Sequence, residues 1–211
     1  MRTEDSAVEK PEQTEDQWET FRSQPAAFAH VRRIVDAFGG LIAQEVASKL
    51  RQEERFRARL SALLAEGHIW SDDFGEGAPS GPVRRLVLLS GAHAETLVRR
   101  CGAVYWARAL LGQIEASTVA AIKQAVGDEA YAAAIAHRDL AAGDVNLPPL
   151  PELDAAITAA GTRCLAAWCD RQPDGIAQRV RLMLPDSPEL AEPPGGPFEE
   201  AGPRIVDRLL A

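Results

Sequence analysis

The segment at residues 84–135 constrains the fold more than any other part of the chain, because its apolar side chains recur at steps of three and four residues. This spacing places them on one side of an α-helix, whereas a half-buried strand would alternate apolar and polar residues. The apolar side contains Leu86, Leu89, His93, Leu97, Cys101, Val104 and Leu111. Charged residues such as Glu95, Arg99 and Arg108 occupy the opposite side, which we interpret as a solvated face.

Local signals divide this segment into several helices. A Ser-Gly pair at residues 90–91 interrupts the pattern, because glycine costs about 1 kcal/mol relative to alanine inside a helix. We therefore expect a short first helix and a longer one at residues 92–113. Ser117 is predicted to cap a further helix that ends at Gly127, and Asp128 is predicted to cap the next one. Helices joined by such tight turns form a compact bundle.

The whole chain is predicted to be all-α, with one domain of 211 residues. Residues 1–15 read as a disordered acidic tail, residues 16–185 as a compact multi-helix bundle, and residues 186–211 as a Pro/Gly-rich linker with a possible terminal helix. Residues 41–64 are expected to form a long helix with a densely charged middle at residues 49–59. That middle is either a solvated face or a docking surface, and both interpretations stay open.

Composition limits the partners and the compartment. The chain has 23 Lys and Arg against 31 Asp and Glu, a formal net charge of −8, so binding to nucleic acid is not expected. Cys101, Cys164 and Cys169 form an odd set without a secretory signal, and we interpret them as buried thiols in a reducing compartment. No apolar run reaches the roughly 18–20 residues of a membrane-spanning helix. A cytoplasmic protein without direct membrane insertion is expected.

No residue pattern predicts catalysis, a metal site or a cofactor site, so we expect a chain that is not an enzyme. The histidines are scattered, and none stands three or four residues from another, as two metal ligands on one helix face would. His93 is expected to pack in the core. Cys164 and Cys169 are five residues apart and do not form a CxxC motif. No nucleophile with a neighbouring base and no acid/base pair is recognisable.

Residues 117–140 have the outline of a helix-turn-helix around Gly127. A recognition helix presents polar or basic side chains at its N-terminal end, but Asp128 and Glu129 would meet the phosphates here. This charge pattern disfavours DNA binding. A helical ligand- or DNA-binding regulator nevertheless remains the alternative hypothesis.

Three stretches resemble the SctK (YscK-like) accessory proteins of bacterial type III secretion systems. The first is LVLL at residues 86–89 with the Gly, Leu and Arg-Arg-Cys that follow up to residue 101. The second is VGDEAYAAAI at residues 126–135, similar to the family's apolar-Gly-acidic-acidic-x-Tyr pattern. The third is a helix with Gly161, Leu165 and Trp168, followed by QRVRLMLP at residues 178–185. The acidic N-terminal tail departs from the family pattern.

This resemblance implies a non-enzymatic adaptor of the cytoplasmic sorting platform, peripheral to the inner membrane through its partners. The implied partners are the cytoplasmic domain of the SctD-like inner-membrane ring protein and the SctQ-like spoke protein, and through the latter the stator and the ATPase. Within that role, Arg84, Arg85, Arg99 and Arg100 are candidate partner contacts. A solvated helix face is the competing interpretation of these four arginines.

Overall fold

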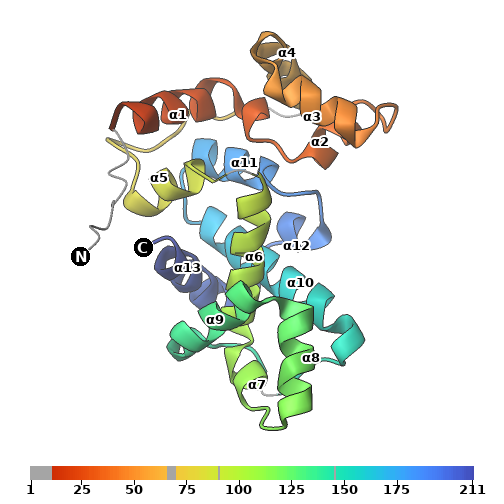
Figure 1. The fold of residues 1–211 in the computed structure, drawn as a ribbon. Helices are drawn as coiled ribbons and strands as arrows, with labels where there is room; N and C mark the ends of the chain where they lie inside the picture. The colour runs from red at the N-terminus through yellow and green to blue at the C-terminus, as the bar shows by residue number, and fades with distance from the viewer. Residues whose placement is uncertain (1–10, 66–69, 90, 145) are drawn as a thin grey trace, which may run out of the picture.

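The computed structural model describes residues 11–65, 70–89, 91–144 and 146–211. Within these ranges the chain forms α-helices and two short 3₁₀-helices but no strand, which confirms the predicted all-α fold (Figure 1). In chain order the elements are α1 (Pro11–Ser23), η1 (Pro25–Ala27), α2 (Val31–Ala37), α3 (Gln44–Gln52), α4 (Glu54–Leu64), α5 (Gly81–Val87), α6 (Gly91–Tyr105), α7 (Ala107–Leu111), α8 (Ala116–Val126), α9 (Asp128–Ala136), η2 (Arg138–Leu140), α10 (Leu150–Cys169), α11 (Asp174–Leu182), α12 (Pro188–Ala191) and α13 (Pro197–Leu209).

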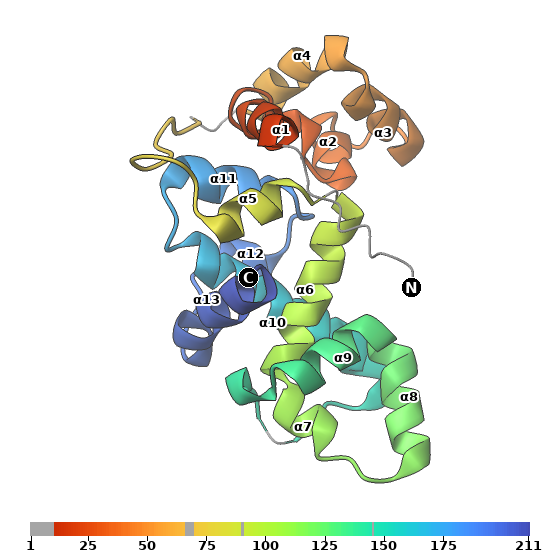
Figure 2. The ribbon, with the colours of Figure 1, turned by 60° about the vertical axis from the view of Figure 1, so that its left-hand side comes forward.

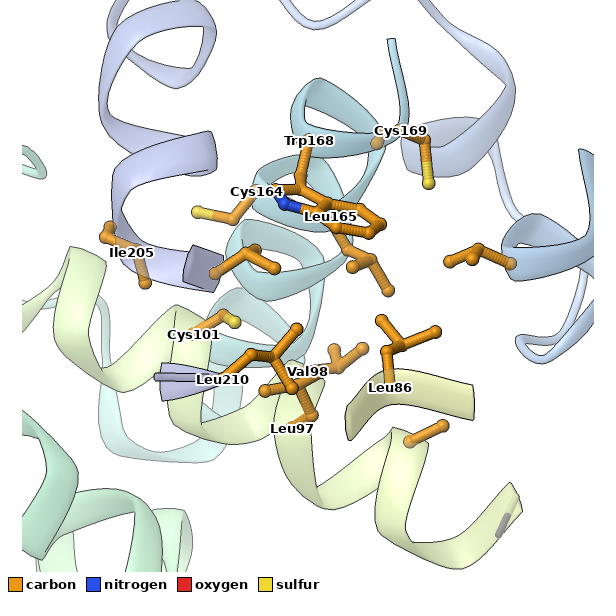
Figure 3. Close-up of a cluster of buried hydrophobic side chains, with 14 of the residues drawn as sticks. Leu86, Leu97, Val98, Cys101, Cys164, Leu165, Trp168, Cys169, Ile205 and Leu210 are labelled. Atoms are coloured by element: carbon orange, nitrogen blue, oxygen red, sulfur yellow. The ribbon is translucent and has the colours of Figure 1, made fainter. Parts of the chain in front are cut away.

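The main core lies where α6, α10 and α13 meet, beneath α5 and α11 (Figure 3). Its side chains include Leu86, Leu97, Val98, Cys101, Cys164, Leu165, Trp168, Cys169, Ile205 and Leu210. The three thiols are buried as predicted. Trp168 is almost fully buried, and its indole N–H donates a 2.8 Å hydrogen bond to the carboxylate of Asp207 on α13. A large buried ring therefore has its polar atom satisfied by the helix that covers it.

Two glycines let α6 and α10 cross with their backbones in contact. A Cβ atom at Gly161 would lie 1.8 Å from the carbonyl oxygen of Val98, and one at Gly102 would lie 1.9 Å from that of Ile157. Neither position can hold a side chain unless the helices move apart. The crossing therefore fixes the position of α6 on α10.

A second apolar cluster lies at the end of the molecule formed by α7, α8, α9 and the first half of α10. It is built from Ala103, Ala107, Leu110, Ile122, Val126, Ala130, Tyr131, Ala134, Leu153 and Ile157. Gly127 separates α8 from α9 with φ +90°, as expected for the predicted helix stop. The α7–α8 connection is the outermost part of this end (Figures 1 and 2).

The opposite end is a small N-terminal lobe, residues 25–64, which has its own apolar cluster around Ile34, Ala47 and Leu60. Hydrogen bonds join the lobe to the main body. The amide of His30 donates to the carbonyl oxygen of Leu182 at 2.7 Å. The guanidinium of Arg33 donates to the carbonyl oxygen of Leu184 and pairs with Asp186 at 2.9 Å.

Helix α1 packs on the main body and is held there by a buried arginine. Arg179 on α11 is 3% exposed, and its guanidinium donates to the backbone carbonyl oxygens of Arg22 and Ser71 at 2.9–3.1 Å. Its guanidinium carbon also lies 4.6 Å from the ring centre of Phe74. One side chain thus joins α1, the loop before α5 and α11.

Some predicted helices are interrupted. The helix expected at residues 92–113 breaks at Trp106, because the carbonyl oxygen of Tyr105 accepts from the amides of Ala142 and Gly143 instead of continuing the helical pattern. His93 was predicted to pack in the core, but it is exposed, whereas the neighbouring Ala94 is buried in the main core; the helix therefore turns its apolar face to the core through Ala94 and not through His93.

The helix expected at residues 41–64 is two helices. Glu53 has extended backbone geometry between them. Arg57 bridges the break by donating to the carbonyl oxygens of Arg51 and Gln52, at 3.4 and 3.1 Å. These bonds satisfy carbonyl groups that the end of α3 leaves without helical partners.

The predicted domain boundaries can be compared with the helices of the structure near both ends of the chain. Most of the predicted tail, at residues 1–10, lies outside the described residues, and α1 already begins at Pro11. At the other end, α13 buries Ile205 and Val206 in the main core. The core therefore extends past residue 185, where the helical domain was expected to end.

Candidate docking surfaces

Metal-ligand groups and reactive thiols are the features that would give the described residues a chemical function. The described residues contain no group of three His, Cys, Asp or Glu side chains that could hold a metal ion. Burial raises the pKa of the Cys101 and Cys169 thiols to about 12, and that of Cys164 well above its usual value. None of these thiols is therefore a thiolate nucleophile near neutral pH. Among the described helices, none is long and apolar enough to span a membrane.

Two of the four predicted contact arginines are engaged within the chain. Arg99 donates to the carbonyl oxygens of Ala125 and Val126 at 2.9 and 3.1 Å, and pairs with Asp154 at 2.6 Å. It thereby ties the C-terminus of α8 to α6 and α10. The guanidinium of Arg85 donates to the backbone carbonyl oxygens of Leu210 and Ala211.

The other two arginines, Arg84 and Arg100, are more accessible to a partner protein. Arg84 is exposed on α5, and Arg100 is half-buried on α6. Neither makes a hydrogen bond or ion pair with the part of the chain that the structure describes. Arg100 lines a shallow pocket with Glu129 and His137 of the neighbouring α9 region. The structure does not gather the four arginines into one patch, and their contact role stays a prediction.

Large exposed apolar side chains lie at both ends of the molecule. Leu41, in the α2–α3 connection, is 89% exposed, and Val46 on α3 is 46% exposed. At the far end Ile114, in the α7–α8 connection, is 97% exposed, and Ile135 on α9 is also exposed. Figures 1 and 2 place the two connections at opposite extremes of the molecule. Side chains of this size that are almost fully exposed are candidate anchors for a protein contact.

The two ends also differ in charge. Residues 31–64, which we call the basic end, carry seven Lys and Arg against four Asp and Glu, although the whole chain has a net charge of −8. Residues 107–154, which we call the acidic end, carry three Lys and Arg against seven Asp and Glu. Opposite charges at separate docking surfaces favour different partners.

A groove adjoins the exposed residues of the basic end. It has a volume of about 530 Å³ and lies between the end of α2, α3 and α4. Its lining comprises Phe38, Leu50, Phe56, Arg59, Leu60, Ala62 and Leu63. No local sequence pattern predicts this groove, because it depends on the break at Glu53 between α3 and α4.

The predicted helix-turn-helix outline corresponds to α8 and α9. Helix α9 packs on α6 and buries Ala130, Tyr131 and Ala134, so this face of the helix is not available to DNA. Asp128 and Glu129 are exposed at its N-terminus. A DNA-reading helix would have to bring these carboxylates towards phosphates, which is unfavourable.

Known proteins resemble the chain over most of its length. The family described as YOP proteins translocation protein K (YscK) matches residues 18–209. The nodulation protein NolU of Rhizobium fredii is 26% identical over 190 residues, which cover 90% of this chain and 85% of the relative. The nodulation protein NolU of Sinorhizobium fredii (strain NBRC 101917 / NGR234) is 25% identical with the same coverage. No solved structure gives a significant match.

Proposed function

The chain belongs to the YscK family of type III secretion accessory proteins, and on that premise we propose that it is a non-enzymatic adaptor of the cytoplasmic sorting platform. It would bridge the cytoplasmic domain of the SctD-like ring protein and the SctQ-like spoke protein, and so connect indirectly to the stator and the ATPase. It would lie in the cytoplasm, held near the inner membrane by its partners.

The observation that supports bridging is the separation of two exposed apolar surfaces. The α2–α3 connection, which contains Leu41, and the α7–α8 connection, which contains Ile114, lie towards opposite ends of the molecule, and the charge of the two ends has opposite sign. An adaptor needs two surfaces that can be occupied at once and that do not compete for one partner. Exposed apolar anchors with charged surroundings provide affinity at the centre of each contact and selectivity at its rim.

The test uses one charge substitution at each end. Leu41→Asp and Ile114→Asp both replace highly exposed side chains, so each should change the free energy of unfolding by no more than about 0.5 kcal/mol. Ala191→Asp on α12, which lies between the two ends, is the matched control. Binding to the purified ring-protein domain and to the spoke protein would be measured by size exclusion with light scattering and by titration.

Each end variant should weaken binding to one partner by about tenfold or more, as expected when an interface loses an anchor worth over 1.4 kcal/mol, and should leave the other partner unaffected. A mixture of all three proteins should give a ternary complex with the unsubstituted chain. The proposal fails if neither partner binds at tens of micromolar, or if a single end variant abolishes both contacts, since the two partners would then share one site.

A further inference from the structure

The groove of the basic end has the form of a helix-binding site. Phe38, Leu50 and Phe56 are only partly buried along it, although they belong to the apolar cluster of the lobe. A volume of about 530 Å³ accommodates a few large side chains and not a folded domain. An amphipathic helix meets this requirement, because its apolar residues three and four positions apart project from one face into such a groove.

The apolar surface continues beyond the groove along α3. Val46 precedes Leu50 by four residues, so both side chains lie on the same face of this helix. Leu41 extends the exposed apolar surface at the N-terminal side of α3. A helix bound in the groove would therefore contact this apolar surface over more than one of its turns.

The rim of the groove is basic. Arg59 lines it directly, and the guanidinium carbon of Arg55 lies 4.7 Å from the ring centre of Phe56. Glu53 pairs with Arg55 at 3.7 Å, and Glu54 lies beside it, so the excess of positive charge is modest. The local charge is nevertheless opposite in sign to the net charge of the whole chain, which is negative. The charge complement of this groove is an acidic peptide.

We infer that the groove at the basic end binds an amphipathic helix whose polar flanks are acidic. This helix belongs to a partner protein, and the inference rests on the proposed function in that it names what one of the two docking ends recognises. Apolar residues of the helix fill the space between Phe38, Phe56 and Leu63, and its carboxylates face Arg55 and Arg59. Charge pairs at the rim raise the association rate and exclude basic helices, while the apolar anchors set the lifetime of the complex.

The experiment is a selection that needs no secretion protein. A phage library would display 16-residue helical peptides with apolar residues fixed at three- and four-residue spacing and with Glu, Lys, Gln or Ser at each flanking position. The full chain would be the target. Affinities of enriched peptides, synthesised with a fluorescent label, would be measured by anisotropy at two salt concentrations.

Enriched peptides should carry net negative charge, and their binding should weaken at higher salt. Arg59→Glu and Val46→Asp should each weaken binding at least about tenfold. Arg204→Glu, the same charge reversal at an exposed position of α13, should leave binding unchanged. Circular dichroism would establish that all three variants keep the helical content of the parent chain.

Three outcomes would overturn the inference. One is enrichment of neutral or basic peptides, or of none at all. Another is enrichment of acidic peptides that bind Arg59→Glu as tightly as the parent. The third is self-association of the chain that Arg59→Glu abolishes, because the acidic end of a second copy would then be the occupant. If the chain binds acidic helical peptides as expected but does not bind the ring or spoke protein, the bridging role fails and the inference about the groove stands.

Discussion

Replacement of Gly161 by alanine should destabilise the protein far more than most single-methyl additions. The new Cβ would lie 1.8 Å from the carbonyl oxygen of Val98, whereas carbon–oxygen contacts between helices are normally no closer than about 3.3 Å. The obstacle is backbone, so no side-chain rotation relieves it. Helices α6 and α10 must therefore separate by about 1.5 Å at the crossing.

That separation would open the main core on both sides of the crossing. A gap of about 0.5–1 Å already forfeits a quarter to a half of the dispersion energy of each contact. Overpacking usually costs about 1–3 kcal/mol, and the required shift places Gly161→Ala at or above the top of that range. The gain in helix propensity offsets only about 1 kcal/mol. We expect a net loss of at least about 2 kcal/mol, or a melting temperature lower by about 4–8 °C.

The assay is urea and thermal unfolding followed by circular dichroism at 222 nm. Gly81→Ala is the matched control, since a Cβ at Gly81 meets nothing within 4 Å and the residue lies in the first turn of α5. The control should be as stable as the parent or slightly more stable. Gly102→Ala should reproduce the loss, because its Cβ would lie 1.9 Å from the carbonyl oxygen of Ile157. A Gly161→Ala variant with parental stability would refute the close crossing.

Three further predictions concern buried polar and ionisable groups. Arg179→Met should lower the free energy of unfolding by about 2–3 kcal/mol in urea titrations, because it leaves the carbonyl oxygens of Arg22 and Ser71 without donors, and an Arg179→Met chain of parental stability would contradict this. Cys101 and Cys169 should resist a thiol reagent at pH 8 until urea unfolds the chain, and labelling in the native state would count against their burial. Because burial raises their folded pKa to about 12, these thiols ionise first in the unfolded chain, so stability should decline as pH rises from about 9 towards 12.

The helical fold and the burial of the cysteines could be predicted from the sequence because they follow from local rules. The spacing of apolar residues defined the core face of α6 and α10, and Gly127 stops α8 at the predicted position. Capping was only partly predictable. Ser117 was expected to cap α8, but Glu115 precedes the helix, and its carboxylate accepts the hydroxyl hydrogen bonds of Ser117 and Thr118. The Ser117 hydroxyl is thus bonded to Glu115, and no side chain accepts from a backbone amide at the start of α8.

The remaining features depend on tertiary contacts that no local pattern contains. The sequence places Gly102 and Gly161 inside predicted helices, but no local pattern shows that the two glycines face each other, because only the crossing of two distant helices requires them. Arg99 lies on a charged helix face and was expected to contact a partner, yet the ends of α8 and α10 supply its acceptors. The groove at the basic end arises from the break at Glu53, which is not marked by glycine or proline.

The two proposed docking ends are attached to the body by different contacts. This difference affects how the protein could bridge two partners. The acidic end is built directly on α6 and α10, and Arg99 holds α8 onto both helices. The N-terminal lobe, which contains the basic end, has a separate apolar cluster and meets the body through Phe28, Leu182 and the polar contacts of His30 and Arg33. Segments with few buried apolar contacts to the rest of a fold reorient at low free-energy cost. If the two ends dock partners as proposed, we therefore expect the basic end to adapt its orientation to its partner, and the acidic end to keep a fixed orientation on the body.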